Sequence, residues 1–261
     1  MNICYWNIHK NSEVPNDEFN KCLVDLLIEK SIDLFCISEF DKFNEEIILE
    51  NDYELVDVLN SDKVKCFKKC GLAFTQIRID DRYAIIEYKR RKLLFVCLHS
   101  YDAINYDEFK RLHCMESIKM EIDDYIKNNG ETNVFILGDF NCMPYDASII
   151  DEDVFNCVLY RDLLYTRVGA KERYYNPMLL LLSEEQKIYG TFYSDHIQQR
   201  NLRWYLLDQV MINRNADKIM NYDSIKIIDR IKEVNLLKNN KPNTSIYSDH
   251  LPLYFEIKEE N

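Results

Sequence analysis

Long apolar runs are absent from this sequence. A membrane-spanning helix needs about eighteen or more mostly uncharged apolar residues in succession, and no such run occurs. A secretory signal peptide has a basic segment and a small-residue cleavage site, and neither is present in the first residues, MNICYWNIHK. We therefore expect a cytoplasmic protein that has no membrane segment.

Glycine and proline are scarce, with five of each in 261 residues. No linker rich in these residues divides the chain, and no internal repeat is present. Because 47% of the residues are hydrophobic, the chain can bury a full core. We expect residues 1–261 to form a single domain.

Basic residues are also in deficit. Lys and Arg total 33 against 45 Asp and Glu, which gives a net charge of -12. Non-specific binding of nucleic acid depends mostly on Lys and Arg that neutralise phosphates, so a globally basic binding surface is excluded. An enzyme of this composition that acts on nucleic acid must use a local basic patch, a bound cation or a small substrate.

The nine cysteines do not indicate a disulfide framework. Their number is odd, the chain is not small, and Cys4, Cys36 and Cys97 lie in apolar runs where a thiol acts as a small hydrophobic group. We expect them to be reduced. Cys66 and Cys70 have the spacing of half a zinc site, but no second Cys/His pair follows, which disfavours zinc.

Short apolar runs recur along the chain, and some are separated by segments with helical spacing. Apolar residues at helical spacing predict helices over 17–30 and 107–127, the second with Phe109 on its apolar face. Helices and strands alternate early and strands crowd together later, which favours mixed sheets packed as layers. Residues 168–193 are the least regular and 238–245 predict an exposed loop, and we expect both to border a cleft. Strands are predicted over 3–8, 34–38, 55–59, 72–77, 83–88, 92–98, 133–137, 204–212, 224–228 and 253–257.

A turn motif follows the predicted strand at 133–137. Gly138 permits a tight backbone turn at the strand end. Residues two apart on an extended chain face the same side, so Asp139 and Asn141 can project together. A carboxylate and a carboxamide that converge there suit a water and a phosphoryl oxygen. The alternative is a simple strand-to-turn cap, since Asp and Asn favour turns.

A second motif places Asp249 and His250 just before the last predicted strand. A carboxylate beside a histidine commonly orients the imidazole for proton transfer or phosphate binding, although a solvated loop would carry the same residues. The tripeptide Ser-Asp-His also occurs at 194–196, but no apolar strand follows it. We interpret Asp195 and His196 as coincidental.

Four further polar residues lie within or at the ends of apolar runs. Asp208 interrupts the run at 204–212, and a buried carboxylate needs a histidine or a metal as partner unless it has water access. His99, Glu39 and Asn7 each lie at or near a predicted strand end. Each of these three is a weak indication alone.

Six short blocks are spread along the chain from the first predicted strand to the last. They are Trp6-Asn7-Ile8, Ser38-Glu39, Leu98-His99-Ser100, Gly138-Asp139-Phe140-Asn141, Leu207-Asp208 and Ser248-Asp249-His250. Taken in this order, the blocks resemble the endonuclease/exonuclease/phosphatase superfamily of deoxyribonuclease I-like enzymes. The resemblance implies a four-layer α/β sandwich of two packed mixed β-sheets flanked by helices, with the site at one end of the sheets.

The resemblance also implies roles for these residues. Glu39 would be the main ligand of a divalent cation, with Asn7 and Asp249 assisting directly or through water. Hard oxygen ligands of this kind suit Mg²⁺ or Mn²⁺. Asp139 would position or activate the attacking water.

The remaining implied roles concern the phosphate. Asn141 and His250 would contact the scissile phosphate, and Asp208 would support the site by pairing with a histidine or a metal. His99 would assist the phosphate or the leaving oxygen, which disfavours the apurinic endonuclease branch, where a tyrosine occupies this position.

The sequence departs from the superfamily pattern at two points. The glutamate is commonly preceded by glutamine, whereas Ser38 precedes Glu39 here. The carboxylate that should orient His99 is not identifiable, and Asp80 and Asp81 are candidates by position only.

Together these features predict a Mg²⁺- or Mn²⁺-dependent phosphoesterase, with DNA as the favoured substrate. Local positive charge for a nucleic-acid partner could come from several residues, among them Arg82 and Lys110, and tyrosines such as Tyr101 could stack on bases. The alternatives are a phosphatase or phosphodiesterase that acts on a small phosphorylated molecule, a nucleotide or a lipid headgroup, and a catalytically inactive binding module. The sequence does not determine the oligomeric state.

Overall fold

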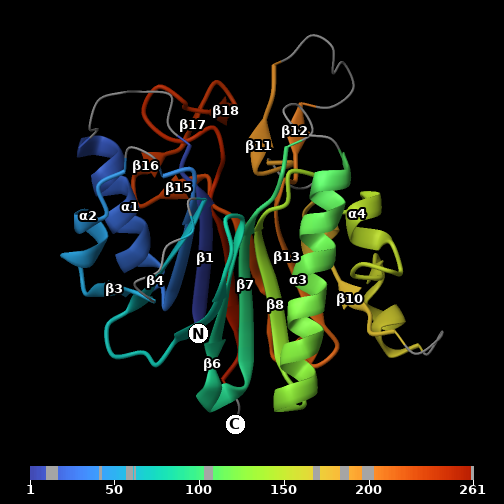
Figure 1. The fold of residues 1–261 in the computed structure, drawn as a ribbon. Coiled ribbons are helices and arrows are strands. Elements are labelled where there is room, and N and C mark those ends of the chain that lie inside the picture. Colours follow the sequence, from blue (N-terminus) through green and yellow to red (C-terminus); the bar gives the residue numbers. More distant parts are fainter. Residues whose placement is uncertain are drawn as a thin grey trace.

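Two β-sheets pack face to face in the computed structural model, with helices on their outer sides (Figure 1). The structure describes residues 1–9, 17–40, 43–56, 61, 63–102, 108–166, 171–182, 188–195 and 203–259. This architecture confirms the expected four-layer α/β sandwich. Within the described ranges, no helix is long and apolar enough to cross a membrane.

The first sheet has six strands in the order β14-β19-β1-β2-β4-β3. Strands β1 and β2 are parallel, and the other neighbours are antiparallel. The strands are β1 (Asn2–Asn7), β2 (Leu34–Ser38), β3 (Tyr53–Leu55), β4 (Val64–Lys69), β14 (Met220–Ile227) and β19 (Leu253–Ile257).

The second sheet has seven strands in the order β5-β6-β7-β8-β13-β10-β9. Strands β7 and β8 are parallel, as are β9 and β10. The strands are β5 (Thr75–Ile79), β6 (Tyr83–Tyr88), β7 (Leu93–His99), β8 (Asn133–Asp139), β9 (Cys157–Val158), β10 (Tyr174–Tyr175) and β13 (Asp208–Asn213).

In the part of the chain that the structure describes, three short strand pairs lie outside the two large sheets, and their members are antiparallel. They are β11 (Phe192–Tyr193) with β12 (Trp204–Tyr205), β15 (Arg230–Ile231) with β16 (Val234–Asn235), and β17 (Leu237–Lys238) with β18 (Lys241–Pro242).

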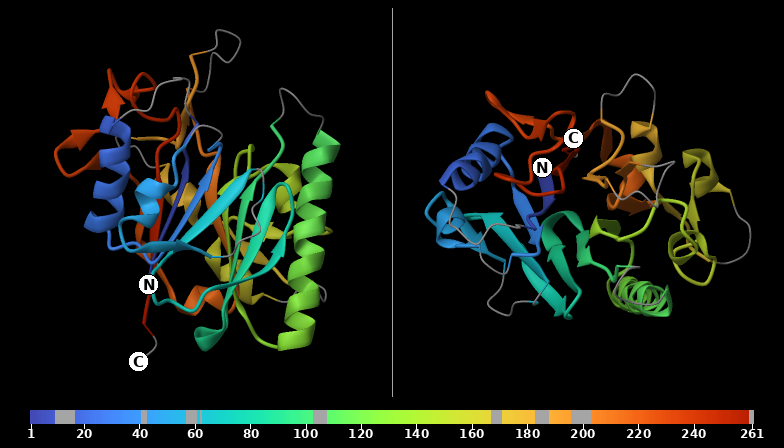
Figure 2. Two further views of the ribbon diagram at one scale, coloured as in Figure 1. Left: turned by 60° about the vertical axis from the view of Figure 1, so that its left-hand side comes forward. Right: turned by 90° about the horizontal axis from the view of Figure 1, so that it is seen from above.

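Two long helices cover opposite outer sides of the sandwich (Figure 2). In α1 (Asp17–Glu29) the buried residues follow helical spacing, and acidic residues in the first turn suit the helix dipole. In α3 (Glu108–Asn129) the buried stripe includes Met115, Ile118 and Ile122. The shorter helices are α2 (Glu46–Leu49), α4 (Ala147–Ile150), η1 (Lys89–Arg91), η2 (Arg161–Tyr165), η3 (Pro177–Leu181) and η4 (Ala216–Lys218).

The apolar core has three layers that follow from the alternation of side chains along each strand. On β1, Trp6 packs in the layer that includes residues of α1, while Tyr5 faces the layer between the two sheets. On β7, Phe95 faces the layer between the sheets, while Val96 packs in the layer that includes residues of α3. Both faces of the central strands are therefore buried, which explains their continuous apolar sequences.

Several sequence predictions need correction in detail. Strand β4 was missed because Lys65, Lys68 and Lys69 interrupt its apolar pattern. The predicted strand at 204–212 is divided into β12 and β13. The predicted loop at 238–245 contains part of a short hairpin, and Phe109 is 70% exposed because it lies outside the buried stripe of α3.

Candidate active site

The strand register brings the predicted residues to one end of the two sheets. Because β7 and β8 are parallel, His99 pairs with Asp139 at their carboxyl ends. The antiparallel strand β13 begins beside them, so Asp208 pairs with Asp139 from the other side. In the first sheet, Asn7 pairs with Ser38 at the carboxyl ends of β1 and β2, and Glu39 follows directly. The end of each sheet therefore contributes part of one polar cluster.

Gly138 allows β8 to pass close to β7 at this point. Its φ is +143°, and a Cβ atom there would lie 2.0 Å from the backbone oxygen of Leu98, so no other residue fits. After the turn, the Asp139 carboxylate accepts a hydrogen bond of 2.8 Å from the Asn141 backbone N–H. The Asn141 side chain in turn donates to the Ser100 carbonyl oxygen at 3.0 Å. Both side chains are thereby fixed by local bonds.

Glu39 is the centre of the first group of contacts. It has a left-handed φ of 53°, and its side chain is 28% exposed. The Asn7 Nδ2 donates to Glu39 Oε1 at 3.0 Å and to Asp139 Oδ2 at 3.1 Å, so the buried carboxamide joins the two carboxylates. The His99 Nε2 lies 2.8 Å from Glu39 Oε1. Glu39, His99 and Asp139 together could hold a metal ion.

His9, which was not among the predicted site residues, belongs to this group. Its Nδ1 lies 2.5 Å from Glu39 Oε2, and its backbone N–H donates to Asn7 Oδ1. Burial raises the pKa of Glu39, but hydrogen bonds to His9 and His99 outweigh this effect and hold the pKa well below its usual value. The position of His9 two residues after Asn7 was a usable signal, because residues at that spacing face the same side of an extended chain.

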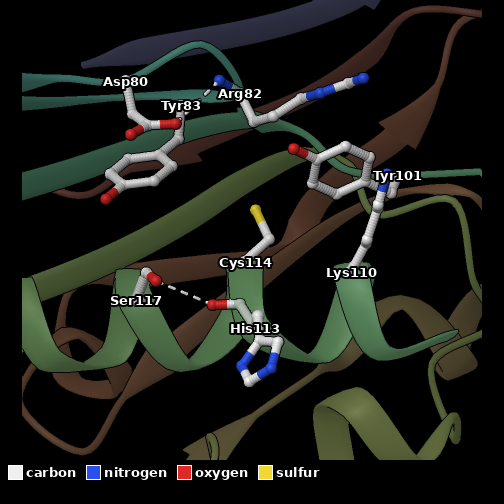
Figure 3. A pocket seen from close by; sticks show the side chains of 8 residues that line it. All are labelled: Asp80, Arg82, Tyr83, Tyr101, Lys110, His113, Cys114 and Ser117. Atoms are coloured by element: carbon white, nitrogen blue, oxygen red, sulfur yellow. Dashed lines mark hydrogen bonds between the residues drawn. The ribbon is translucent and has the colours of Figure 1, made fainter. Parts of the chain in front are cut away.

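Arg82 occupies the position where an orienting carboxylate was expected. Its Nη1 lies 3.3 Å from His99 Nδ1, and its guanidinium lies 4.2 Å from the centre of the Tyr101 ring. Figure 3 shows the Arg82 and Tyr101 side chains beside each other. A guanidinium only donates hydrogen bonds, so Nδ1 accepts and the ring hydrogen is on Nε2, which faces Glu39. The proposed partners Asp80 and Asp81 are therefore replaced by Arg82 in this contact.

Asp208 and His250 form the second group, on the other side of Asp139. The His250 Nδ1 lies 2.7 Å from Asp208 Oδ2, and both side chains are buried. The Trp6 Nε1 donates to the His250 carbonyl oxygen at 2.9 Å, which fixes the backbone there. This confirms the expected histidine partner of Asp208.

Burial and charge act in opposite directions in this second group. Burial lowers the pKa of His250, but Asp208, Asp139 and Asp249 raise it from 6.5 to about 10, so the imidazole is cationic near neutral pH. Burial, followed by the nearby Asp208 carboxylate, raises the pKa of Asp139. Asp139 therefore lies between a cationic histidine and a strongly ionised glutamate.

The donor atoms at this end of the sheets fit a hard divalent cation. Glu39 and Asp139 offer carboxylate oxygens, and Asn7 lies between them with a carboxamide. Among the described side chains, Asp208 Oδ1 is a buried oxygen that has no hydrogen-bond partner. Oxygen-rich sites of this type favour Mg²⁺ or Mn²⁺ over zinc.

Two other residues named from the sequence make separate contacts. Asp249 is half-buried, accepts a hydrogen bond from the Ser248 hydroxyl and contributes to the raised pKa of the neighbouring His250. Among the described residues, it is not part of either potential metal cluster that contains Asp139. Asp195 forms exposed ion pairs with Arg203 and Lys241, while His196 lies outside the described residues.

Cys66 and Cys70, which have the spacing of half a zinc site, lie in different environments. Cys70 is exposed, whereas Cys66 is buried with Cys36 and Cys97, and the three sulfur atoms lie within 4.8 Å of one another. All nine cysteines are free in the structure.

No protein-family model and no curated protein sequence matches the chain. Solved structures match over nearly its whole length. TDP2 from D. rerio in complex with a single-strand DNA product is 12% identical with a TM-score of 0.59, covering 98% of this chain and 97% of that chain. An AP endonuclease from Archaeoglobus fulgidus is 14% identical with a TM-score of 0.59, covering 99% of this chain and 100% of that chain.

A third match is the 3′ phosphatase NExo from Neisseria bound to a product DNA hairpin. It is 13% identical with a TM-score of 0.62, and the alignment covers 99% of this chain and 100% of that chain. At these identities the likeness establishes the fold. The neighbours are members of the endonuclease/exonuclease/phosphatase superfamily, and this chain has the fold of that superfamily along almost its entire length.

Proposed function

We propose that this chain is a Mg²⁺- or Mn²⁺-dependent nuclease that hydrolyses phosphodiester bonds in DNA. The observation that carries the proposal is the position of Asp139. Its carboxylate is linked through Asn7 to Glu39 on one side and lies beside the Asp208–His250 pair on the other. A potential cation site, a potential base and a cationic histidine thus meet at one point.

Glu39 would hold the cation, with Asn7 and Asp249 assisting directly or through water. When bound, the cation would supply positive charge to the phosphate oxygens, which a phosphodiester needs because its own charge repels a nucleophile. The raised pKa of Asp139 suits a residue that orients a water and accepts its proton as the water oxygen attacks phosphorus. The bond from phosphorus to the leaving oxygen then breaks.

The histidines and Asn141 would stabilise the charge that develops on the phosphate. His250 is cationic through its contact with Asp208, so its ring can donate to a phosphate oxygen. His99 presents the hydrogen on Nε2 and would donate to the phosphate or the leaving oxygen. Asn141 would add a contact from the neighbouring turn.

DNA is favoured over other polymers by two neighbours of the same fold, whose structures contain a single-strand DNA product and a product DNA hairpin. We further propose that residues 1–261 act as one domain and that the protein is cytoplasmic. The net charge of -12 favours a second candidate function, hydrolysis of a small phosphate ester, because such a substrate needs no extended basic surface.

The test is cleavage of supercoiled plasmid, single-stranded DNA and RNA with Mg²⁺, Mn²⁺ or EDTA. Glu39→Gln and Asp139→Asn remove one charge each with little change in shape, and we expect each to reduce turnover by about a thousandfold or more. Asp153→Asn is a matched control, since the side chain of Asp153 is 76% exposed and forms an ion pair with Lys171, which takes no part in these contacts. Circular dichroism would show that each variant is folded.

Metal-dependent cleavage of DNA that Glu39→Gln and Asp139→Asn abolish, and Asp153→Asn retains, would support the nuclease. Turnover of soluble phosphate esters with none of the three polymers cleaved would support the second candidate. Turnover that persists in both site variants, or in EDTA, would contradict both.

A further inference from the structure

A hollow of 280 Å³ opens on the outer side of the seven-stranded sheet, at the same end as the candidate active site. Its walls come from the turn before β6, the residues after β7 and the first turns of α3 (Figure 3). The residues that matter here are Asp80, Arg82, Tyr83, Tyr101, Lys110 and Cys114.

One side chain separates this hollow from the catalytic residues. Arg82 lines the hollow, is only 9% exposed, and reaches His99 Nδ1 with its guanidinium. The same guanidinium lies over the ring of Tyr101. A ligand in the hollow would therefore touch a residue that also fixes the orientation and tautomer of His99.

The two sides of the hollow carry side chains of opposite charge. Arg82, Tyr101 and Lys110 lie together on one side, while Asp80 lies beside Tyr83 on the other (Figure 3). The hollow thus combines two cations with aromatic surface in a chain whose net charge is -12. Cations bind phosphate, and tyrosine rings offer stacking surfaces to bases of any sequence. Asp80 can accept hydrogen bonds from amino groups on a base.

The size of the hollow limits what it can hold. At about 30 Å³ for each water in the liquid, its volume equals roughly nine water molecules. This exceeds the needs of a single phosphate group and lies just below the range of about 300–1,000 Å³ for pockets that enclose drug-sized ligands. One nucleotide unit is the ligand of matching size and chemistry.

We propose that this hollow binds one nucleotide of the substrate strand next to the scissile phosphodiester, with its phosphate at Arg82 and Lys110 and its base against Tyr101. The inference rests on the proposed function, because it names a subsite of the same substrate. It predicts that changes in the hollow reduce hydrolysis of a nucleic-acid strand more than hydrolysis of a small phosphodiester that has no neighbouring nucleotide.

The experiment compares kcat/KM for a single-stranded oligonucleotide of about ten nucleotides with kcat/KM for bis(p-nitrophenyl) phosphate. In Lys110→Glu we expect the ratio of oligonucleotide kcat/KM to ester kcat/KM to fall about tenfold, because one charge-assisted contact with phosphate is lost. In Tyr101→Leu, which keeps an apolar side chain over Arg82, we expect a similar fall from the loss of stacking. Lys127→Glu makes the same charge change in the last turn of α3 and should leave the ratio unchanged.

Equilibrium binding of the same oligonucleotide, measured by fluorescence anisotropy in EDTA, gives a readout that does not need turnover. Lys110→Glu should weaken binding about tenfold and reduce the slope of log K against log salt by about 0.7, the value for one phosphate contact on a single strand. An unchanged ratio and unchanged binding in Lys110→Glu and Tyr101→Leu would overturn the inference while leaving hydrolysis intact. If oligonucleotide binding depends on Lys110 but no turnover occurs, the inference that the hollow binds a nucleotide would be supported and the proposed function contradicted. Absence of both turnover and binding would overturn both.

Discussion

The Asp208–His250 pair offers a quantitative test of the electrostatics of the site. Asp208→Asn preserves the shape of the side chain but removes the charge that faces the buried imidazole at 2.7 Å. A pKa raised from 6.5 to about 10 corresponds to about 5 kcal/mol of net stabilisation of cationic His250, after the opposing effect of burial. Asp139 and Asp249 contribute part of this, and loss of the Asp208 charge also relieves repulsion on Asp139. We therefore expect Asp208→Asn to cost about 2 kcal/mol of unfolding free energy.

The pH dependence of this cost has a definite sign. His250 has a higher pKa in the folded protein than in the unfolded chain, so the folded state binds more protons. Its stabilising effect is fully present below 6.5 and is lost as the pH rises through about 10. The stability difference between wild type and Asp208→Asn should therefore be largest at about pH 6 and nearly absent at about pH 10.

Urea denaturation followed by tryptophan fluorescence measures this difference, since Trp6 is buried and donates to the carbonyl oxygen of His250. Wild type and Asp208→Asn are compared at the same pH each time. The contributions of groups that titrate equally in both proteins therefore cancel in the stability difference. A stability difference that stays the same at about pH 6 and about pH 10 would refute the reasoning. A difference that grows with pH would mean that folded Asp208→Asn binds more protons than the folded wild type, which is the opposite of the expected sign.

Three further predictions concern stability and thiol access. Gly138→Ala should lower the unfolding free energy in urea by about 2–4 kcal/mol, because the added methyl meets the Leu98 backbone at a φ that favours glycine; an effect under about 0.5 kcal/mol would contradict this. Burial raises the pKa of Asp217, but hydrogen bonds from Arg161, Tyr165 and Tyr222 outweigh this effect and lower it. The ionised Asp217 therefore stabilises the folded protein above pH 3.8, the pKa of an ordinary Asp, and this stabilisation is lost as the pH falls through the lower pKa of the folded state. Asp217→Asn should thus lower the unfolding free energy by about 1–3 kcal/mol at neutral pH and by less in acid. Denaturation curves that show the same loss of unfolding free energy at both pH values would contradict this prediction. Mass spectrometry after brief native alkylation should find Cys70 modified and the eight buried cysteines protected, whereas rapid labelling of Cys36 would contradict the packing.

Much of the secondary structure could be predicted because burial on both faces leaves continuous apolar runs. Strands β2, β6 and β19 begin and end where the sequence predicted. Strand β4 could not be found in this way, since its lysines make the local pattern polar while β2 and β3 supply its hydrogen bonds. The exposure of Phe109 likewise depends on which stripe of α3 faces the sheet.

The candidate site was predictable where a residue type stands out at a strand end. Asp139, Asp208 and His99 were found in this way, and the register places them side by side. His9 was not selected although it lies two residues after Asn7, and Arg82 was named only as a source of positive charge, because their contacts with Glu39 and His99 depend on the tertiary structure.

The sequence by itself determined the class of fold and the chemical types at the site, because apolar alternation and polar strand ends are local properties of the chain. Only the tertiary structure decided which polar group faces which. Asn7 joins Glu39 to Asp139, and Arg82 stands beside His99 where a carboxylate was expected. These contacts join residues up to 132 positions apart, and a local pattern contains no information about pairing over such separations.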